Sequence, residues 1–406
     1  MTAHETKARL AARLQAAREA AGYSKTDVAK LLGTDRQRVH GMETGDRPVD
    51  VTTLLQLARL YGRDASSFLM DEEPDITAVP VELRSANQPL SAESRAAIQL
   101  WGHLCGMYAQ LQAHYGESTG PGRLERWLRE GGNSRLRDFA IEGHAQAVRQ
   151  EMGLDEDSVG ARIFNLISSH GIPVFRIALG QNGVEGAFVN YPGLGPVILV
   201  NRDKLLTRQI FTAAHELGHV IYEARKQGEA AVTFLGQKNP SESQIDRFAS
   251  SFLMPRTAID LFLAQHLQQG EEGLGADDVV HLQRHFGVSY SAMLVRLRRL
   301  GHLSAARFDE LKLVSPLSRA TRLGYVLEPW EYGTPPSSTP EAIVSGLPKA
   351  YVTLVLSGLE DGLLSQAAAA EAMLLSLEEL ERYLYVIGQK EPDLDSELAF
   401  YDEHVA

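Results

Sequence analysis

Residues 208–219 have the sequence RQIFTAAHELGH, which ends in an H-E-x-x-H pattern within a helical run. At 100° and 1.5 Å per residue, His215 and His219 lie about 40° apart and about 6 Å along the axis, so both imidazoles can reach one ion. Glu216 points to the side of this pair, where it can accept a proton from water that a metal acidifies. The alternative is a histidine pair on a solvated face, but the apolar neighbours predict a buried helix, where unpaired histidines are costly.

A third ligand must come from another helix. Glu223 is eight residues from His215, which is about 12 Å of rise and too far to complete a compact site. Glu242 opens the next predicted helix, and Asp246 lies one turn further on the same face. We expect His215, His219 and Glu242 to bind one Zn²⁺ per chain, with Mn²⁺ as the alternative. We expect Asp246 to hydrogen bond to the other nitrogen of a ligand histidine. In the competing interpretation, Glu242 is only a charge at a helix N-terminus and Asp246 is only a solvated side chain.

The sequence around this motif predicts an α+β domain with a small three-stranded sheet. Two helical stretches precede three short runs rich in β-branched residues, and two further helices follow, the second ending at Pro255. The predicted helices are Phe139 to Met152, Val159 to His170, Lys204 to Arg225 and Ser241 to Leu253, and the predicted strands are Ile172 to Leu179, Val184 to Asn190 and Val197 to Asn201.

The first seventy residues predict a separate all-helical domain of five short helices. Ser24 and Asp35 are placed to cap two of them, and Gly33 allows the sharp turn between, as a helix-turn-helix requires. This pattern resembles the XRE (Cro/cI-like) helix-turn-helix family. The resemblance implies base-edge contacts from the second capped helix, by Arg36, Gln37, Arg38 and His40. It also implies phosphate contacts from Lys25, at the start of the preceding helix, and from Arg47, just past the second one. The alternative interpretation is that these residues form only the solvated face of an exposed helix and contact no DNA.

The rest of the chain divides at breaks in composition. An acidic, proline-bearing stretch at 71–80 predicts a linker, helical periodicity returns at 91–116, and three prolines at 334–340 predict a last boundary. We therefore predict four regions: residues 1–70, a helical connector at 71–137, the α+β domain at 138–312, and a linker with a helical C-terminal domain at 313–406. Residues 347–384 resemble a second helix-turn-helix that carries only two basic residues, Lys349 and Arg382, so we expect a structural or protein-contact role.

Composition restricts the function. Residues 1–70 carry 11 Lys and Arg against 8 Asp and Glu, a net +3, whereas the remainder carries 29 against 44, a net −15. The positive charge that DNA needs is therefore confined to the N-terminus. Cys105 is the single cysteine, which fits a reducing cytoplasm and excludes thiolate-rich zinc sites. Because there is no signal-like N-terminus and no run of 18 apolar residues, we expect a cytoplasmic protein without a membrane span.

Residues 208–219, followed by ESQIDRFASSFLMP at 242–255, resemble the ImmA/IrrE family of zinc metallopeptidases. The resemblance covers about 138–302 and includes FGVS at 286–289 and RLRRLG at 296–301. It implies a zincin-like peptidase fold, zinc bound by the two histidines and Glu242, and Glu216 as general base. It also implies a repressor as substrate, in phage, mobile-element or DNA-damage control. Ile245 departs from the alanine of many members. Residues 6–69 resemble the XRE (Cro/cI-like) helix-turn-helix family.

We therefore expect a multidomain, mainly α-helical regulator that binds double-stranded DNA through residues 1–70 as a homodimer. The peptidase hypothesis has it cleave a helix-turn-helix repressor. In the rival hypothesis, the peptidase-like domain of a transcriptional regulator senses a ligand or partner and cuts nothing. A third hypothesis, an antitoxin-like or phage-defence partner, differs from these two in biological context and not in the residues involved. An oxyanion-stabilising residue is left open among Tyr222, His266, His281 and His285.

Overall fold

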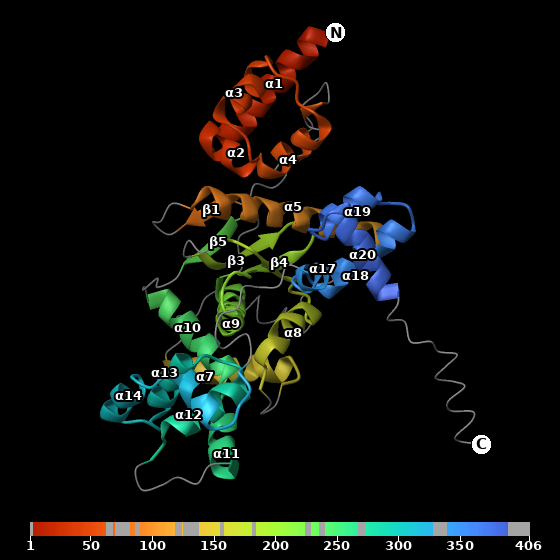
Figure 1. The fold of residues 1–406 in the computed structure, drawn as a ribbon. Coiled ribbons are helices and arrows are strands. Elements are labelled where there is room, and N and C mark those ends of the chain that lie inside the picture. The colour runs from red at the N-terminus through yellow and green to blue at the C-terminus, as the bar shows by residue number, and fades with distance from the viewer. Residues whose placement is uncertain are drawn as a thin grey trace, which may run out of the picture.

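The computed structural model describes residues 3–61, 68–69, 82–85, 90–117, 124, 138–154, 158–180, 184–223, 229–234, 240–266, 273–327 and 339–388. The predicted linkers at 71–80 and 334–340 lie wholly or mostly outside these residues. Figure 1 shows the N-terminal helices at one end, a sheet in the middle, and helices on both of its faces. Among the described helices, none combines the length and hydropathy that a membrane crossing needs.

Four N-terminal helices form the first unit, with a core that includes Leu14, Val28, Val39 and Met42. The Ser24 side chain accepts a hydrogen bond from the Asp27 backbone, and the Asp35 side chain accepts one from the Arg38 backbone, so both predicted caps are present. Gly33 has φ +64°, which a side chain would disfavour. Of the predicted fifth helix, only residues 68–69 are described. The four helices are α1 (Ala3–Ala20), α2 (Lys25–Leu31), α3 (Arg36–Thr44) and α4 (Val51–Tyr61).

A five-stranded mixed sheet forms the centre of the chain, in the order β1-β5-β3-β4-β2. The three predicted strands are present, and two short strands from elsewhere in the sequence extend the sheet beyond the prediction. β3 is antiparallel to both neighbours, whereas β1–β5 and β2–β4 are parallel pairs. The strands are β1 (Glu82–Ser85), β2 (Val174–Ile177), β3 (Val184–Tyr191), β4 (Gly195–Asn201) and β5 (Glu229–Phe234).

The two faces of the sheet are covered by different helices. On one face, Phe188, Ile198 and Val200 pack with α9 (Leu206–Glu223) and α10 (Pro240–Leu253) in one core. On the other face, Ala187 and Leu199 pack with α5 (Ala92–Tyr115) and with the C-terminal helices. This division follows from the two-residue period of a strand. The segments predicted as a connector and as a C-terminal domain therefore share a core with the sheet.

The remaining helices complete these two cores. α7 (Asp138–Glu151) packs on α10, and α8 (Ile163–Ser169), preceded by the 3₁₀ turn η4 (Gly160–Arg162), packs on α9. α11 (Arg256–His266), α12 (Ala276–Phe286), α13 (Tyr290–Leu300) and α14 (Ala305–Leu311) lie at the end of the molecule opposite the N-terminal unit (Figure 1). α15 (Pro316–Arg322) packs on α12. The C-terminal helices are α17 (Pro340–Val344), α18 (Lys349–Glu360), α19 (Gln366–Ala372) and α20 (Leu377–Gly388). Leu374, with φ +61°, forms the α19–α20 turn of the predicted second helix-turn-helix-like unit.

The N-terminal unit docks on the start of α5. The Lys30 ammonium donates to the Glu93 carboxylate at 2.5 Å, and the Arg95 guanidinium donates to the Gly22 carbonyl and stacks over the Tyr23 ring. Ala92 and Ala96 of α5 pack against the core of the unit. Since α5 also covers the sheet, this one helix joins the two parts of the chain (Figure 1).

Helices α9 and α10 approach closely because Gly218 has no side chain. A Cβ atom at Gly218 would lie 3.0 Å from both Ile245 Cγ2 and Phe248 Cδ1, so close that these two side chains would have to shift. The far end of α10 is held by two buried arginines: Arg149 donates to the Phe252 carbonyl and Arg296 to the Met254 carbonyl, each at 2.8 Å. α10 is therefore positioned by the close contact at Gly218 and, at its C-terminal end, by the two arginines.

We expect Gly218→Val to lower the free energy of unfolding by about 1–3 kcal/mol, because the added methyl groups overpack the α9–α10 contact. The matched control is Gly143→Val on α7, since Gly143 is exposed and a Cβ atom there would have no neighbour within 4 Å. The control should change stability by less than about 0.5 kcal/mol. Urea denaturation followed by circular dichroism measures both. Equal effects of the two substitutions would contradict the close-packing argument.

Candidate metal centre

The H-E-x-x-H side chains lie on the buried part of α9, between the sheet and α10. His215 is 6% exposed, His219 is 3% exposed and Glu216 is fully buried. α9 is held there by its apolar residues, among them Ala213, Leu217 and Val220, which pack in the core beneath the sheet. A buried site of this kind requires partners for its polar groups, and α10 supplies them.

Three ligand atoms converge at this point. His215 Nε2 lies 3.0 Å from His219 Nε2 and 3.1 Å from Glu242 Oε2, and His219 Nε2 lies 3.5 Å from the same carboxylate oxygen. A tetrahedral zinc ion with nitrogen and oxygen ligands at about 2.0–2.1 Å keeps its ligand atoms about 3.3 Å apart. The observed separations therefore fit a single ion, and these three residues are the described group that could hold a metal.

Asp246 orients the first histidine. Its Oδ1 lies 2.9 Å from His215 Nδ1, so the carboxylate can accept the proton of that nitrogen and leave Nε2 directed at the convergence point. The side chain of Asp246 is 46% exposed, whereas that of Glu242 is 13% exposed. The centre therefore opens to solvent on the Asp246 side of α10.

The electrostatics of the centre favour a negative carboxylate facing the imidazoles. Burial opposes the charged form of His215, but hydrogen bonds to Asp246 and Glu242 outweigh it and raise its pKa. Burial likewise opposes the charged form of Glu242, but hydrogen bonds with His215 and His219 hold its pKa well below the usual range. The anionic Glu242 is the form that can ligate a cation.

Strand β3 shapes the other side of the centre, which sequence reasoning did not identify. A Cβ atom at Gly186 would lie 2.9 Å from Glu216 Oε1 and 2.7 Å from Thr212 Cγ2, so only glycine allows this approach. The Phe188 ring stacks on the His219 imidazole with ring centres 5.6 Å apart. A glycine within a β-rich run indicates close backbone approach, and this was the available signal.

The candidate oxyanion residues have other surroundings. Tyr222 packs edge-on against Phe248, and burial raises the pKa of its hydroxyl above the usual range. His281 on α12 hydrogen bonds to the Tyr325 hydroxyl at 2.6 Å. The other two candidates, His266 and His285, pack on the Phe262 ring. The structure thus brings Asp246 to the ligand set and gives these four side chains contacts with other residues.

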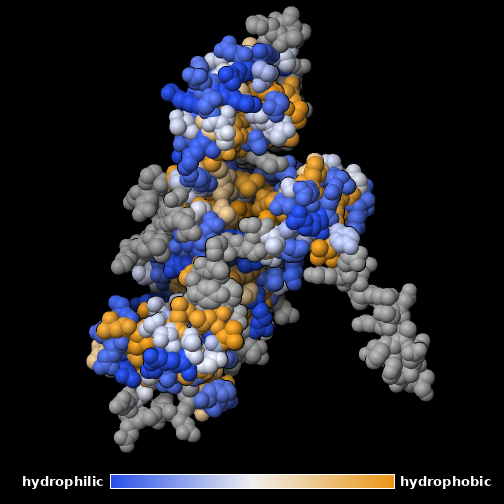
Figure 2. Space-filling model, in the orientation of Figure 1, coloured by the Kyte–Doolittle hydropathy of each residue, from blue (hydrophilic) through white to orange (hydrophobic). Residues whose placement is uncertain are grey.

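The candidate DNA contacts lie on the exposed side of α3. The side chains of Arg36, Gln37, Arg38 and His40 are exposed, whereas Val39 between them is buried. The face of the N-terminal unit seen in Figure 2 carries mostly hydrophilic residues. The contacts of this unit with α5 are made by other residues, among them Lys30, Gly22 and Tyr23.

The two residues expected at phosphates, Arg47 and Lys25, differ in whether their side chains already contact other protein groups. Arg47 is exposed, as a phosphate contact requires. The Lys25 ammonium lies 3.4 Å from Glu43 and 2.9 Å from His40 Nδ1. Glu43 is itself paired with Arg18, whose guanidinium Nε donates to it at 2.6 Å. A contact from Lys25 to DNA would therefore compete with a protein carboxylate.

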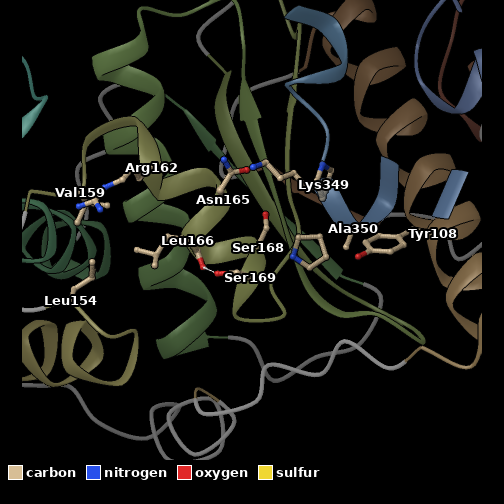
Figure 3. Close-up of a pocket in the computed structure, with 12 residues that line it drawn as sticks. Tyr108, Leu154, Val159, Arg162, Asn165, Leu166, Ser168, Ser169, Lys349 and Ala350 are labelled. Atoms are coloured by element: carbon tan, nitrogen blue, oxygen red, sulfur yellow. Dashed lines mark hydrogen bonds between the residues drawn. The ribbon is translucent and has the colours of Figure 1, made fainter. Parts of the chain in front are cut away.

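A separate hollow of about 590 Å³ lies between α8 and the start of α18 (Figure 3). Its lining includes Arg162, Asn165 and Ser168 on one side and Lys349 and Tyr108 on the other. It is formed by different helices from the α9–α10 centre.

Comparisons with known families agree with this geometry. Residues 167–298 match the IrrE N-terminal-like domain of peptidase family M78, and residues 9–67 match a helix-turn-helix domain. A comparison with curated proteins finds no match. The first match spans the strands β2–β4, α9 and α10 and so contains all four residues of the candidate centre, and the second spans α2 and α3. The chain therefore joins an N-terminal helix-turn-helix domain, which supports DNA binding, to a metallopeptidase-like domain of the IrrE N-terminal-like family.

Proposed function

We propose that this chain is a DNA-binding regulatory zinc endopeptidase that cleaves a transcriptional repressor or a similar regulatory protein. The observation that carries the proposal is the convergence of His215, His219 and Glu242 within 4.8 Å, beside the fully buried carboxylate of Glu216. Two imidazoles and one carboxylate are the protein ligands of a catalytic zinc site, which leaves a fourth position open. The family match supports a peptidase-like domain at the same residues.

Each side chain of the centre has a role in hydrolysis. A bound zinc ion would polarise a peptide carbonyl and lower the pKa of water. Glu216 would accept the proton of the attacking water and pass it to the leaving amine, for which its buried position next to the histidines is suitable. Asp246 would hold the His215 ring and keep its Nε2 available as a ligand. Phe188 and Gly186 would exclude water and other side chains from the inner wall of the centre.

The N-terminal domain would bring this activity to DNA or to a DNA-bound repressor. Arg36, Arg38 and Gln37 are exposed near the start of α3, the end of a recognition helix that meets base edges. Arginine suits the guanine edge and glutamine the adenine edge. A homodimer would place two such helices on a two-fold symmetric site.

We predict that the purified chain holds about one zinc ion and cuts a helix-turn-helix repressor encoded beside it. His219→Ala should lose the metal, whereas Glu216→Gln should keep the metal and cleave at least 100-fold more slowly, because only the proton acceptor is removed. Metal analysis and mass spectrometry of the products measure these effects. Glu223→Gln, at the end of the same helix, is the control. Full cleavage by Glu216→Gln would refute the mechanism, and metal-free, chelator-resistant protein would refute the zinc site.

We predict that Arg38→Ala weakens binding to DNA selected by the wild-type protein from a random pool by about 1–3 kcal/mol. The reason is the loss of base-edge hydrogen bonds from the exposed side of α3. Arg322→Ala on α15 removes the same charge from an exposed site outside the N-terminal domain and should leave affinity unchanged. Fluorescence anisotropy at fixed salt measures both. A similar loss in the two variants would mean that only net charge matters.

A further inference from the structure

The hollow between α8 and α18 lies outside the metal centre and has no part in the proposed hydrolysis (Figure 3). Its volume of about 590 Å³ is in the range of pockets that hold small molecules. One wall is α8 with the 3₁₀ turn before it, and the opposite wall is the start of α18 with Tyr108 of α5. The hollow therefore has the dimensions of a ligand site formed by three helices.

The wall formed by α8 and the preceding turn presents polar side chains at a helical spacing. Arg162, Asn165 and Ser169 follow one another at intervals of three and four residues, so they share the face that lines the hollow. The opposite face carries Ile163 and Ile167, which are fully buried in the core with α9. The Asn165 amide forms no hydrogen bond within the described part of the chain, so it is available to a ligand.

The hollow carries positive charge without a carboxylate beside it. Among its described lining residues, Arg162 and Lys349 are basic and none is acidic, although the whole chain has a net charge of −12. Arg162 donates to the Ser158 carbonyl at 2.5 Å, a neutral partner that leaves its charge uncompensated. Lys349 forms no ion pair with a described residue, and Figure 3 shows its side chain extending from α18 toward Asn165. These two cations favour an anionic ligand.

Apolar side chains form much of the remaining lining. An inorganic anion would leave this apolar surface in contact with water, whereas an anion with an apolar body would cover it and gain the free energy of burial. The lining therefore favours a molecule that is charged at one end and apolar over the rest. The apolar lining residues are Leu154, Val159, Leu166, Pro173, Pro348 and Ala350.

One arginine of β2 holds both walls in place. The Arg176 backbone N–H donates to the Gly346 carbonyl at 2.7 Å, and its guanidinium donates to the Ser345 carbonyl at 2.6 Å. The same guanidinium lies over the Phe164 ring of α8, 4.5 Å from its centre. A Cβ atom at Gly346 would lie 2.6 Å from the Arg176 carbonyl oxygen, so only glycine allows the segment before α18 to approach β2 this closely. The hollow is therefore formed before a ligand binds, which lowers the free-energy cost of binding.

We propose that the hollow between α8 and α18 binds a small organic anion, with its acidic group beside Lys349 and Asn165 and its apolar body against the remaining lining. The acidic group is a carboxylate or a phosphate ester, since both accept charge-assisted hydrogen bonds from lysine. Arg162 adds a second positive charge that attracts the ligand to the same wall. The site does not rest on the proposed function, because none of its residues belongs to the metal centre.

A ligand in the hollow would touch helices that belong to the two different cores. α8 packs on α9, which carries the two histidines, whereas α18 packs on α5, on which the N-terminal domain docks. A molecule bound between α8 and α18 adds contacts to both helices and stabilises the folded chain by mass action. Binding should therefore raise the temperature at which the chain unfolds.

The probe for the charged part of the site is anilinonaphthalene sulfonate (ANS), which joins an anion to an aromatic body and fluoresces in apolar surroundings. We expect the wild-type chain to bind ANS, and Lys349→Gln to bind it at least tenfold more weakly because the charge-assisted hydrogen bond is lost. Lys312→Gln removes the same charge from an exposed residue at the end of α14 and should bind as tightly as the wild type. Equal affinity of Lys349→Gln and the wild type would overturn the proposal.

A second variant fills the hollow and keeps both cations. Ala350 lines the hollow as the second residue of α18, so Ala350→Trp should weaken ANS binding at least tenfold. The matched control is Ala367→Trp, at the exposed second residue of α19, which is outside the lining. Circular dichroism checks that each variant is folded. Wild-type affinity in folded Ala350→Trp, or a wild-type chain with no saturable binding up to about 1 mM ANS, would overturn the proposal.

Three competitors with the same naphthalene body test the acidic group. They are 1-naphthoate, a carboxylate, 1-naphthyl phosphate, a phosphate ester, and 1-naphthol, a phenol that is neutral near pH 7. We expect at least one anion to displace ANS at a tenfold lower concentration than 1-naphthol, and to raise the unfolding temperature of the wild type more than that of Lys349→Gln. The anion that binds more tightly identifies the acidic group. Equal displacement by all three would overturn an anionic ligand.

Cleavage and ligand binding are tested separately. Glu216→Gln removes the proposed proton acceptor and should bind ANS as the wild type does, because Glu216 is not part of the lining. A chain that binds the anions and cuts no repressor would count against the proposed function alone. A chain that cuts a repressor and binds neither ANS nor the naphthyl anions would count against this proposal alone.

Discussion

The close contact between α9 and α10 is the constraint on which the candidate centre depends. His215 and His219 belong to one helix and Glu242 to the other, so the three ligand atoms meet only if the two helices pack closely. Gly218 permits this, since a side chain there would collide with Ile245 and Phe248. Ile245 is thus accommodated by the glycine of the H-E-x-x-H motif itself.

Buried polar groups far from the centre hold the C-terminal end of α10. Arg149 and Arg296 each donate to a carbonyl at the end of α10, and Arg296 also pairs with Glu142 of α7. Burial alone would raise the pKa of Glu142, but its hydrogen bonds with Arg296 hold that pKa below the usual value. A helix end with unsatisfied carbonyls would be costly in this core, so these residues stabilise the position of α10.

Helix α5 connects the two domains that the chain combines. Its first turn carries Ala92, Glu93 and Arg95, which contact the helix-turn-helix domain, and its later turns carry Trp101 and Tyr108, which pack on the sheet. Strand β1 precedes α5 and pairs with β5, which in turn pairs with β3. The DNA-binding domain and the metallopeptidase-like domain are thus linked through packed elements and through backbone pairing at the sheet edge.

The sequence by itself determined the features that depend on short-range spacing. Four residues along one helix align His215 with His219, and another four align Glu242 with Asp246, because the helical repeat is 3.6 residues. Ser24 and Asp35 are recognisable as caps since each needs only a backbone N–H three residues ahead.

Only the tertiary structure decided the features that depend on contacts between distant segments. The predicted sheet lacked β1 and β5, since four or six residues without strong alternation carry little signal until a neighbouring strand pairs with them. The segment predicted as a connector proved to cover the sheet, because a helix with one apolar face does not reveal which surface will bury it. Gly186 acquires its role only where β3 meets Glu216, a contact between residues thirty positions apart that local periodicity cannot specify.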